Sequence, residues 1–350
     1  MSTPSPPSRR RIASIIWFPV FFAIALPLAF EIALHAPQPH NLQIAVVGSA
    51  RQVSETAGEL HGLSAGGFTV RRLPSAAAAT AAVRDRQVAA AYVDDGSAAR
   101  VYLARAASPI RANYLQGVFA AIAGETGHQP PPVVDLVPPA AGDGGTGVFF
   151  VVFPLMMIGL ITAIVLLQLP TWRIGRRVAA VAVVGVIGTA ATYLTAVKLH
   201  ILPDKPLLLV YAFLLTQVFG QLGVGAAPLL KQYFLPAAIT FALILSVPSS
   251  GGTVSADLLP TPFRYLSDVL PMAQAVKVIR SVAYFNNADI APPTLLMLLW
   301  TAIAAGVVAI AWLRQPGTRP ARAQTSVGTS GAATSDPDSR PPTASGVSGA

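Results

Sequence analysis

Long apolar stretches separated by polar segments recur along this chain. A run of about 18 or more apolar residues is enough to cross the roughly 30 Å hydrocarbon core of a membrane as a helix. Six stretches meet or approach that length: Ile12–Leu34, Val148–Leu169, Val178–Val197, Leu207–Ala227, Phe234–Val247 and Thr294–Leu313. The fifth is the weakest, because it is short and Pro236 interrupts it. The pattern as a whole predicts a polytopic α-helical membrane protein with six spans.

Between the first two apolar stretches, residues 35–146 are polar and their periodicity changes. Short or alternating apolar runs indicate strands, and longer amphipathic runs indicate helices. The predicted strands are Leu42–Gly48, Phe68–Leu73, Val88–Val93, Val101–Ala106 and Val133–Val137, and the predicted helices are Arg51–His61, residues 75–86 with Ser75 as N-cap, and Pro109–Ile122. Asp94, Asp95 and Gly96 form a turn signal, so the third and fourth strands should pair as a hairpin. This segment is predicted to be a small inserted α/β domain.

The composition agrees with a membrane location. Of the 350 residues, 53% are hydrophobic and only 11% are charged, whereas a soluble domain has about 25% charged residues. The mean hydropathy is +0.58. These values argue against a soluble globular enzyme. The chain has no cysteine, which excludes disulfides and thiolate metal sites.

The net charge of +9 falls where the span pattern places cytoplasmic segments. Lys and Arg close to the span ends set the orientation of a membrane protein. Ten basic residues lie on one side of a six-span arrangement: Arg9, Arg10, Arg11, Arg173, Arg176, Arg177, Lys231, Arg314, Arg319 and Arg322. Both termini are therefore predicted to be cytoplasmic, with residues 35–146 outside the plasma (inner) membrane. Nucleic-acid binding is not expected, since it needs a basic patch on a folded surface.

The predicted organisation has five parts. They are a cytoplasmic tail at 1–11, a first transmembrane helix at 12–34, the extracytoplasmic domain at 35–146, a five-helix transmembrane domain at 147–313 and a disordered cytoplasmic tail at 314–350. The first helix is expected to be a retained anchor, because its apolar run is longer than that of a signal peptide. The last tail has too few large apolar residues to fold.

Two sequence patterns resemble catalytic or nucleotide-binding motifs but lie in the wrong context. Gly62–Gly66 fits G-x-S-x-G, yet it follows a predicted helix and precedes a strand, the reverse of a nucleophile elbow. Gly142–Gly147 fits G-x-G-x-x-G, yet it leads into a membrane span and is better interpreted as a linker. The five histidines lack ligand spacing, and no Gly-Lys pair could form a P-loop. We expect no enzyme activity, cofactor or metal on this chain.

Polar residues inside the predicted spans are few. Gln217 and Gln221 lie four residues apart, so they share one face of the fourth span. Side-chain amides can form hydrogen bonds between membrane helices, and nearby glycines let helices approach closely. The pair is interpreted either as helix packing or as the lining of a substrate path or dimer seam. Tyr193 in the third span is a further candidate for the path or seam.

The last outer loop, Pro248–Ala291, is the most informative segment. Its prolines divide it into short amphipathic helices over residues 258–285. Low charge and an apolar face suit the membrane interface, so these helices are expected to lie on, or dip into, the outer leaflet. Arg280 is expected to anchor them to lipid headgroups or to a carboxylate such as Asp257 or Asp268, and the alternative is that it contacts a substrate.

The same loop carries a series of short motifs in a fixed order. They are Ser250, Gly251 and Gly252; Leu259 and Pro260; Leu270 and Pro271; Arg280; and Tyr284 and Phe285. This series resembles the C-terminal signature of type-2 ABC exporter permeases, most closely their phage-infection-protein-like relatives. One span, an outer α/β insert and five further spans is also similar to the topology of that family.

The resemblance implies a function and partners. It implies a permease that contacts membrane lipids, works as a homodimer or with a second permease, and moves a lipid, polysaccharide, peptide or drug outward. A separate ATPase would supply the energy. In that family it docks between the second and third spans, which makes Arg173, Arg176 and Arg177 candidate partner contacts. Because segment 170–177 is short and basic, the alternative is an ATPase-independent protein whose outer domain binds or scaffolds an envelope ligand.

Overall fold

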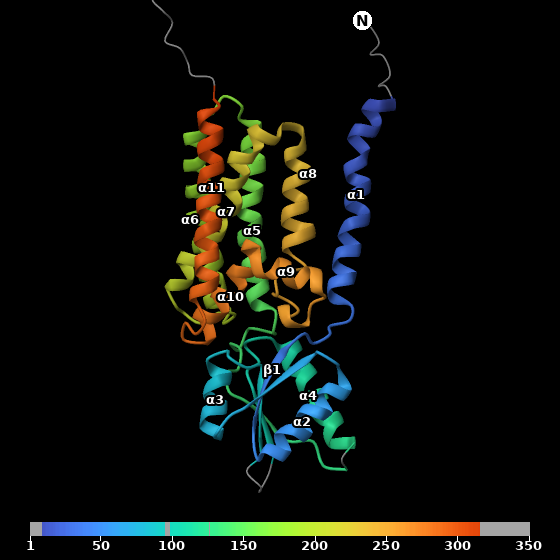
Figure 1. Ribbon diagram of the computed structural model, residues 1–350. Coiled ribbons are helices and arrows are strands. Elements are labelled where there is room, and N and C mark those ends of the chain that lie inside the picture. Colours follow the sequence, from blue (N-terminus) through green and yellow to red (C-terminus); the bar gives the residue numbers. More distant parts are fainter. Residues whose placement is uncertain (1–8, 95–98, 126, 316–350) are drawn as a thin grey trace, which may run out of the picture. The chain divides into compact units, whose positions relative to one another are not determined.

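Five stretches of the described chain are helical, long and apolar enough to cross a membrane (Figure 1). The computed structural model describes residues 9–94, 99–125 and 127–315, with side chains described from Ile16 onward. The five stretches are Ile16–Leu34, Gly147–Gln168, Ile174–Lys198, Leu207–Ser246 and Ala291–Leu313. The predicted tails at 1–11 and 314–350 lie almost entirely outside the described residues. A polytopic helical membrane protein is therefore the architecture that these residues support.

The helices of these stretches have the following bounds. They are α1 (Arg9–Leu34), α5 (Gly147–Val165) with the 3-10 turn η1 (Leu166–Gln168), α6 (Ile174–Lys198), α7 (Leu207–Leu230) and α11 (Ala291–Leu313). Close packing between α5, α7 and α11 depends on glycine. A Cβ on Gly159 would lie 2.4 Å from the carbonyl oxygen of Thr216, and one on Gly225 would lie 2.7 Å from the backbone nitrogen of Val308. Small residues at these crossings let the backbones touch.

The stretch Leu207–Ser246 is 40 residues long and changes direction at its middle. Helix α7 ends before Lys231, whose φ of 50° and ψ of −119° break the helix. After the 3-10 turn η2 (Lys231–Tyr233), the chain continues as α8 (Phe234–Ile239) and the π-helical turn η3 (Thr240–Ser246). In Figure 1, α8 runs as a separate helix near α5. The predicted fifth span is thus 13 helical residues, about 20 Å at 1.5 Å per residue, which is shorter than the hydrocarbon core.

The polar segment after α1 forms a five-stranded sheet with helices packed against it, and we call this segment the α/β domain. Its elements are β1 (Leu42–Val47), α2 (Ala50–Leu63), β2 (Phe68–Arg72), α3 (Ala76–Arg84), β3 (Ala90–Asp94), β4 (Ala99–Leu103), α4 (Pro109–Glu125) and β5 (Val133–Asp135). The strand order is β2-β1-β3-β4-β5, and only the β3–β4 pair is antiparallel, as expected for the hairpin. Ser75 caps α3 through a hydrogen bond from the backbone N–H of Ala78.

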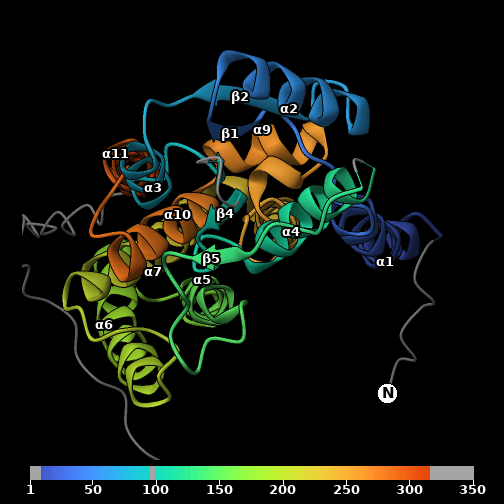
Figure 2. The same cartoon turned by 90° about the horizontal axis from the view of Figure 1, so that it is seen from below.

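The two faces of this sheet have different cores. Ile44 and Val46 of β1 pack with Leu60 of α2 and Phe119 of α4, whereas Ala45 packs on the opposite face with residues of α3. Figure 2 shows α2 and α4 on one side of the strands and α3 on the other. Alternation along β1 therefore separates the two clusters, as the pleat of a strand requires.

The loop after η3 forms three short helices: η4 (Ala256–Leu258), α9 (Thr261–Val269) and α10 (Pro271–Tyr284). Pro260 is the N-cap residue of α9, and Pro271 occupies the first turn of α10, where a missing N–H does no harm. Nearly all of α10 is buried, including Met272, Ile279 and Arg280. The prediction of helices lying on the lipid surface is wrong for α10, because α5, α7 and α11 pack around it and take it out of contact with lipid.

Candidate functional site

Arg280 of α10 fixes the glycine turn of the predicted loop motif. Its guanidinium donates to the backbone carbonyl of Gly251 (2.7 Å) and to that of Gly252 (2.8 Å). Gly251 has a φ of 69°, which favours glycine, and a Cβ on Gly252 would lie 2.8 Å from the Phe149 ring. The expected pairing of Arg280 with Asp257 or Asp268 is wrong. Those carboxylates pair with other basic groups, and the buried guanidinium bonds to carbonyls instead.

The end of the motif joins α10 to the α/β domain. Phe285 is only 4% exposed and packs into the α3 side of the domain core. The Tyr284 hydroxyl donates to Asp143 Oδ2 (3.0 Å) and lies equally close to the carbonyl oxygen of Ile201. Burial, followed by the nearby Asp143 charge, raises the pKa of Tyr284. We call the contact between the α/β domain and segment 250–289 the junction.

Asp143 makes the predicted linker an ordered turn. Its Oδ1 accepts hydrogen bonds from the backbone N–H groups of Gly145 (2.8 Å) and Gly147 (2.7 Å) at the start of α5. A Cβ on Gly142 would lie 2.1 Å from the carbonyl oxygen of Leu199. The G-x-G-x-x-G stretch therefore serves a tight turn next to Tyr284.

Arg111 and Arg86 make further contacts across the junction. Arg111 at the start of α4 donates to Asp257 of η4 at 2.7 Å, with the two side chains 18% and 26% exposed. Burial would raise the pKa of Asp257, but the Arg111 charge and its hydrogen bond hold that pKa below its usual range. Arg86, which follows α3 with a φ of 61°, donates to the carbonyl oxygen of Lys277 in α10 at 3.3 Å. Its guanidinium also lies 5.4 Å from the centre of the Phe285 ring.

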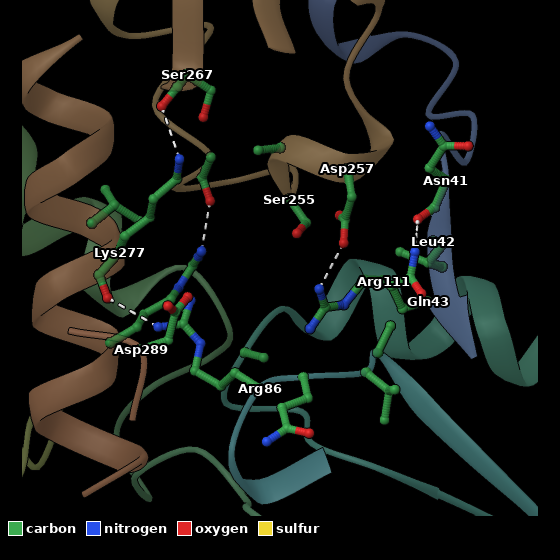
Figure 3. A pocket seen from close by; sticks show the side chains of 18 of the residues that line it. Asn41, Leu42, Gln43, Arg86, Arg111, Ser255, Asp257, Ser267, Lys277 and Asp289 are labelled. Atoms are coloured by element: carbon green, nitrogen blue, oxygen red, sulfur yellow. Dashed lines mark hydrogen bonds and ion pairs between the residues drawn. The ribbon is translucent and has the colours of Figure 1, made fainter. Parts of the chain in front are cut away.

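These groups surround a cavity of about 250 Å³ in the junction, the junction cavity (Figure 3). Its charged lining residues are Arg86, Arg111, Lys277, Arg280, Asp257 and Asp289. Figure 3 shows Arg86 and Arg111 entering from the α/β domain and Lys277 from α10. Gly251 and Arg280, both from the predicted motif, also line it. Arg86, Arg111 and Lys277 are not among the residues that the sequence predicts for a site. Only the expectation that their segments lie on the same, extracytoplasmic side of the membrane could have pointed to them.

Gln217 and Gln221 lie together on α7, as predicted, and face α6. The Nε2 of Gln217 donates to the carbonyl of Val181 (3.3 Å), and the Nε2 of Gln221 donates to that of Val178 (3.2 Å). Gln221 also donates to Gln217 Oε1 at 3.0 Å, while its own Oε1 is buried without a partner. These bonds support helix packing. Both residues also line an apolar cavity of about 480 Å³ between α6, α7 and α11, which suits a path.

The other predicted residues lie apart from the junction cavity. The Tyr193 hydroxyl of α6 donates to Asp204 at 2.5 Å, which fixes the α6–α7 loop. Arg173 is the N-cap residue of α6, and Arg176 and Arg177 lie in its first turn. Arg177 donates to the carbonyl of Leu169, so it closes the short connection before α6. Gly62–Gly66 spans the end of α2 and the loop before β2, and the described residues contain no group of three or more potential metal ligands.

Comparisons with protein-family models, with characterised proteins and with solved structures found no match to this chain.

Proposed function

We propose that this chain is the permease-like subunit of an ABC-type exporter that moves a lipid, drug-like compound or other envelope component outward. The observation that carries this proposal is the burial of α10 between membrane helices while it is bound to the α/β domain. Arg280, 7% exposed, bonds to the Gly251–Gly252 turn, and Phe285, 4% exposed, packs into the α/β domain. A simple membrane anchor for an outer domain needs neither a buried helix nor a fixed contact of this kind.

The proposed topology has six crossings, of which α8 with η3 is the fifth in chain order and the shortest. Basic residues support this orientation. Arg173 lies between α5 and α6, Lys231 between α7 and α8, and Arg314 after α11, whereas the α/β domain lies between α1 and α5. If the chain crosses the membrane in alternating directions, Arg173, Lys231 and Arg314 lie at one end of the bundle and the α/β domain lies at the other. By the positive-inside rule, the α/β domain is then extracytoplasmic.

The proposed mechanism is alternating exposure of a path between the helices of two copies, or of this chain and a second permease. The apolar cavity at Gln217 and Gln221 is lined by the start of α6 and the end of α11, so it would open toward the cytoplasmic side. Helices α9 and α10 would close the outer side. Since Phe285 packs into the α/β domain and Arg86 of that domain donates to the Lys277 carbonyl of α10, movement of that domain would move the closure.

The second candidate is an ATPase-independent membrane protein whose outer domain binds an envelope ligand. Two observations favour it. The junction cavity is polar and charged, and only five residues separate η1 from α6, where an exporter would need an ATPase docking surface.

Purification of the tagged full chain from its native membrane in mild detergent, followed by mass spectrometry, separates the two candidates. The exporter proposal predicts a P-loop ATPase in stoichiometric amount. It also predicts loss of that ATPase in the variant R173Q/R176Q, because these side chains are the candidate contacts. An intact protein that reproducibly purifies without an ATPase would instead favour the second candidate.

A further inference from the structure

Two arginines at the junction cavity have no acidic partner. Among the described residues, Arg111 pairs with Asp257 and Lys277 pairs with Asp268, whereas neither Arg86 nor Arg280 has a carboxylate within 4.0 Å. Arg280 is almost fully buried, and Arg86 is partly buried. Buried charges are normally paired or fully hydrogen-bonded, since their desolvation is costly. Two unpaired guanidinium groups at one cavity therefore call for a counter-charge.

The positive groups also repel one another. Burial, followed by the Arg86 and Arg111 charges, lowers the pKa of Arg280 to about 10. Burial, followed by the Arg111 charge, lowers the pKa of Arg86 as well. Arginine side chains are charged at neutral pH. The lining has four basic residues against the two carboxylates Asp257 and Asp289, so the cavity carries a net positive charge that an anion would offset.

The cavity also contains polar atoms without a partner. The Ser267 side chain is fully buried at the end of α9, and its hydroxyl has no hydrogen-bond partner. The two hydrogen bonds of Arg280 to Gly251 and Gly252 use two of the five N–H groups of its guanidinium, and Arg86 donates one to the carbonyl of Lys277. The lining thus offers N–H donors and a hydroxyl that a bound group could satisfy.

We propose that the junction cavity binds an oxyanion of the phosphate class through Arg86, Arg280 and Ser267. Guanidinium groups match phosphate oxygens in geometry and charge, and a serine hydroxyl can donate to a third oxygen. A volume of about 250 Å³ admits phosphate or a phosphate-ester headgroup but excludes the acyl chains of a lipid. The anion is therefore either free phosphate or the headgroup of a phospholipid whose chains lie outside the cavity. The inference concerns binding alone, so it does not depend on the export proposal.

The test measures binding to the purified full chain in detergent and in lipid nanodiscs. Inorganic phosphate is titrated against chloride at equal ionic strength, with the unfolding temperature as the readout, because a ligand stabilises the state that binds it. In parallel, native mass spectrometry compares nanodiscs of phosphatidylcholine alone with nanodiscs that also contain phosphatidylglycerol. Stabilisation by phosphate assigns free phosphate, whereas retention of phosphatidylglycerol alone assigns a headgroup.

Three variants decide whether the binding occurs in this cavity. Arg86→Gln should weaken binding at least about tenfold, since a charge-assisted bond is lost. Ser267→Ala should weaken it about 2- to 10-fold without loss of stability, because the hydroxyl has no partner to lose. Arg84→Gln, an exposed residue at the end of α3, is the matched control and should bind like the wild type. Binding by neither source, or equal binding in Ser267→Ala and the wild type, would overturn the proposal.

Discussion

Replacing Arg280 by glutamine is expected to release the Gly251–Gly252 turn from α10 and to lower the stability of the whole chain. The substitution leaves the carbonyl groups of Gly251 and Gly252 buried without their donors. Each such group costs about 1–3 kcal/mol, partly offset because a buried charge is also removed. A net loss of about 2–4 kcal/mol should lower the unfolding temperature in detergent by about 5–15 °C.

Two comparison variants make this result specific. Arg280→Lys should be intermediate, because an ammonium cannot present the planar fork that reaches both carbonyl groups. Arg264→Gln removes an arginine of α9 whose guanidinium lies 5.7 Å from the centre of the Tyr265 ring, and this variant should unfold within about a degree or two of the wild type. Equal unfolding temperatures for Arg280→Gln and Arg264→Gln would contradict the role assigned to Arg280.

Replacing Arg111 by glutamine is expected to invert the pH dependence that Asp257 contributes. In the wild type, burial acts to raise the pKa of Asp257. The Arg111 charge is the main effect that opposes burial, and the pKa of Asp257 is held below its usual range. Its stabilising contribution is therefore complete above the unfolded pKa of about 3.9 and is lost only as the pH falls through the folded pKa. Without Arg111, burial should raise the pKa of Asp257. The ionised carboxylate is then unfavourable at pH 7, and the penalty disappears as the pH falls through the raised value.

The measurement is the unfolding temperature of both proteins at several pH values from about 7.5 to 5. Arg111→Gln should lose about 1–3 kcal/mol at neutral pH, because the pair is only partly buried, and should regain part of that loss toward pH 5. Arg51→Gln is the matched control. It breaks an exposed pair with Glu55 and should have a small effect at every pH. Parallel pH curves for the wild type and Arg111→Gln would show that Asp257 does not depend on Arg111.

The sheet could be predicted because its signals are local. The strand around Ile44 is a continuous apolar run, Ser75 is a good cap, and Asp94 begins a turn signal whose next residues, 95–98, lie outside the described residues. Each of these signals depends on neighbours in sequence. Gly251, Gly252 and Arg280 stand out in the sequence as parts of one motif series, but the sequence does not predict the hydrogen bonds between them.

The junction could not be predicted, because its contacts join distant segments. Arg86 and Lys277 are 191 residues apart in sequence, and their contact uses a backbone carbonyl that no side-chain pattern reveals. The burial of α10 was missed for a different reason. An amphipathic helix with Lys277 and Arg280 suits a lipid interface as well as a protein core, and only the surrounding helices α5, α7 and α11 decide between them.

The central claim, outward movement through this chain, is tested most directly by transport into inverted membrane vesicles. Fluorescent phosphatidylglycerol, fluorescent phosphatidylcholine and ethidium serve as probes, and ATP is added at the exposed cytoplasmic face. The account predicts ATP-dependent accumulation of at least one probe in the inner leaflet or the lumen, and none with the variant Q217L/Q221L. That variant should still fold, because amide bonds between membrane helices contribute only about 0.6 kcal/mol each. Wild-type transport by Q217L/Q221L would reduce the glutamines to packing residues, and equal rates for every probe in vesicles with and without the chain would contradict the account.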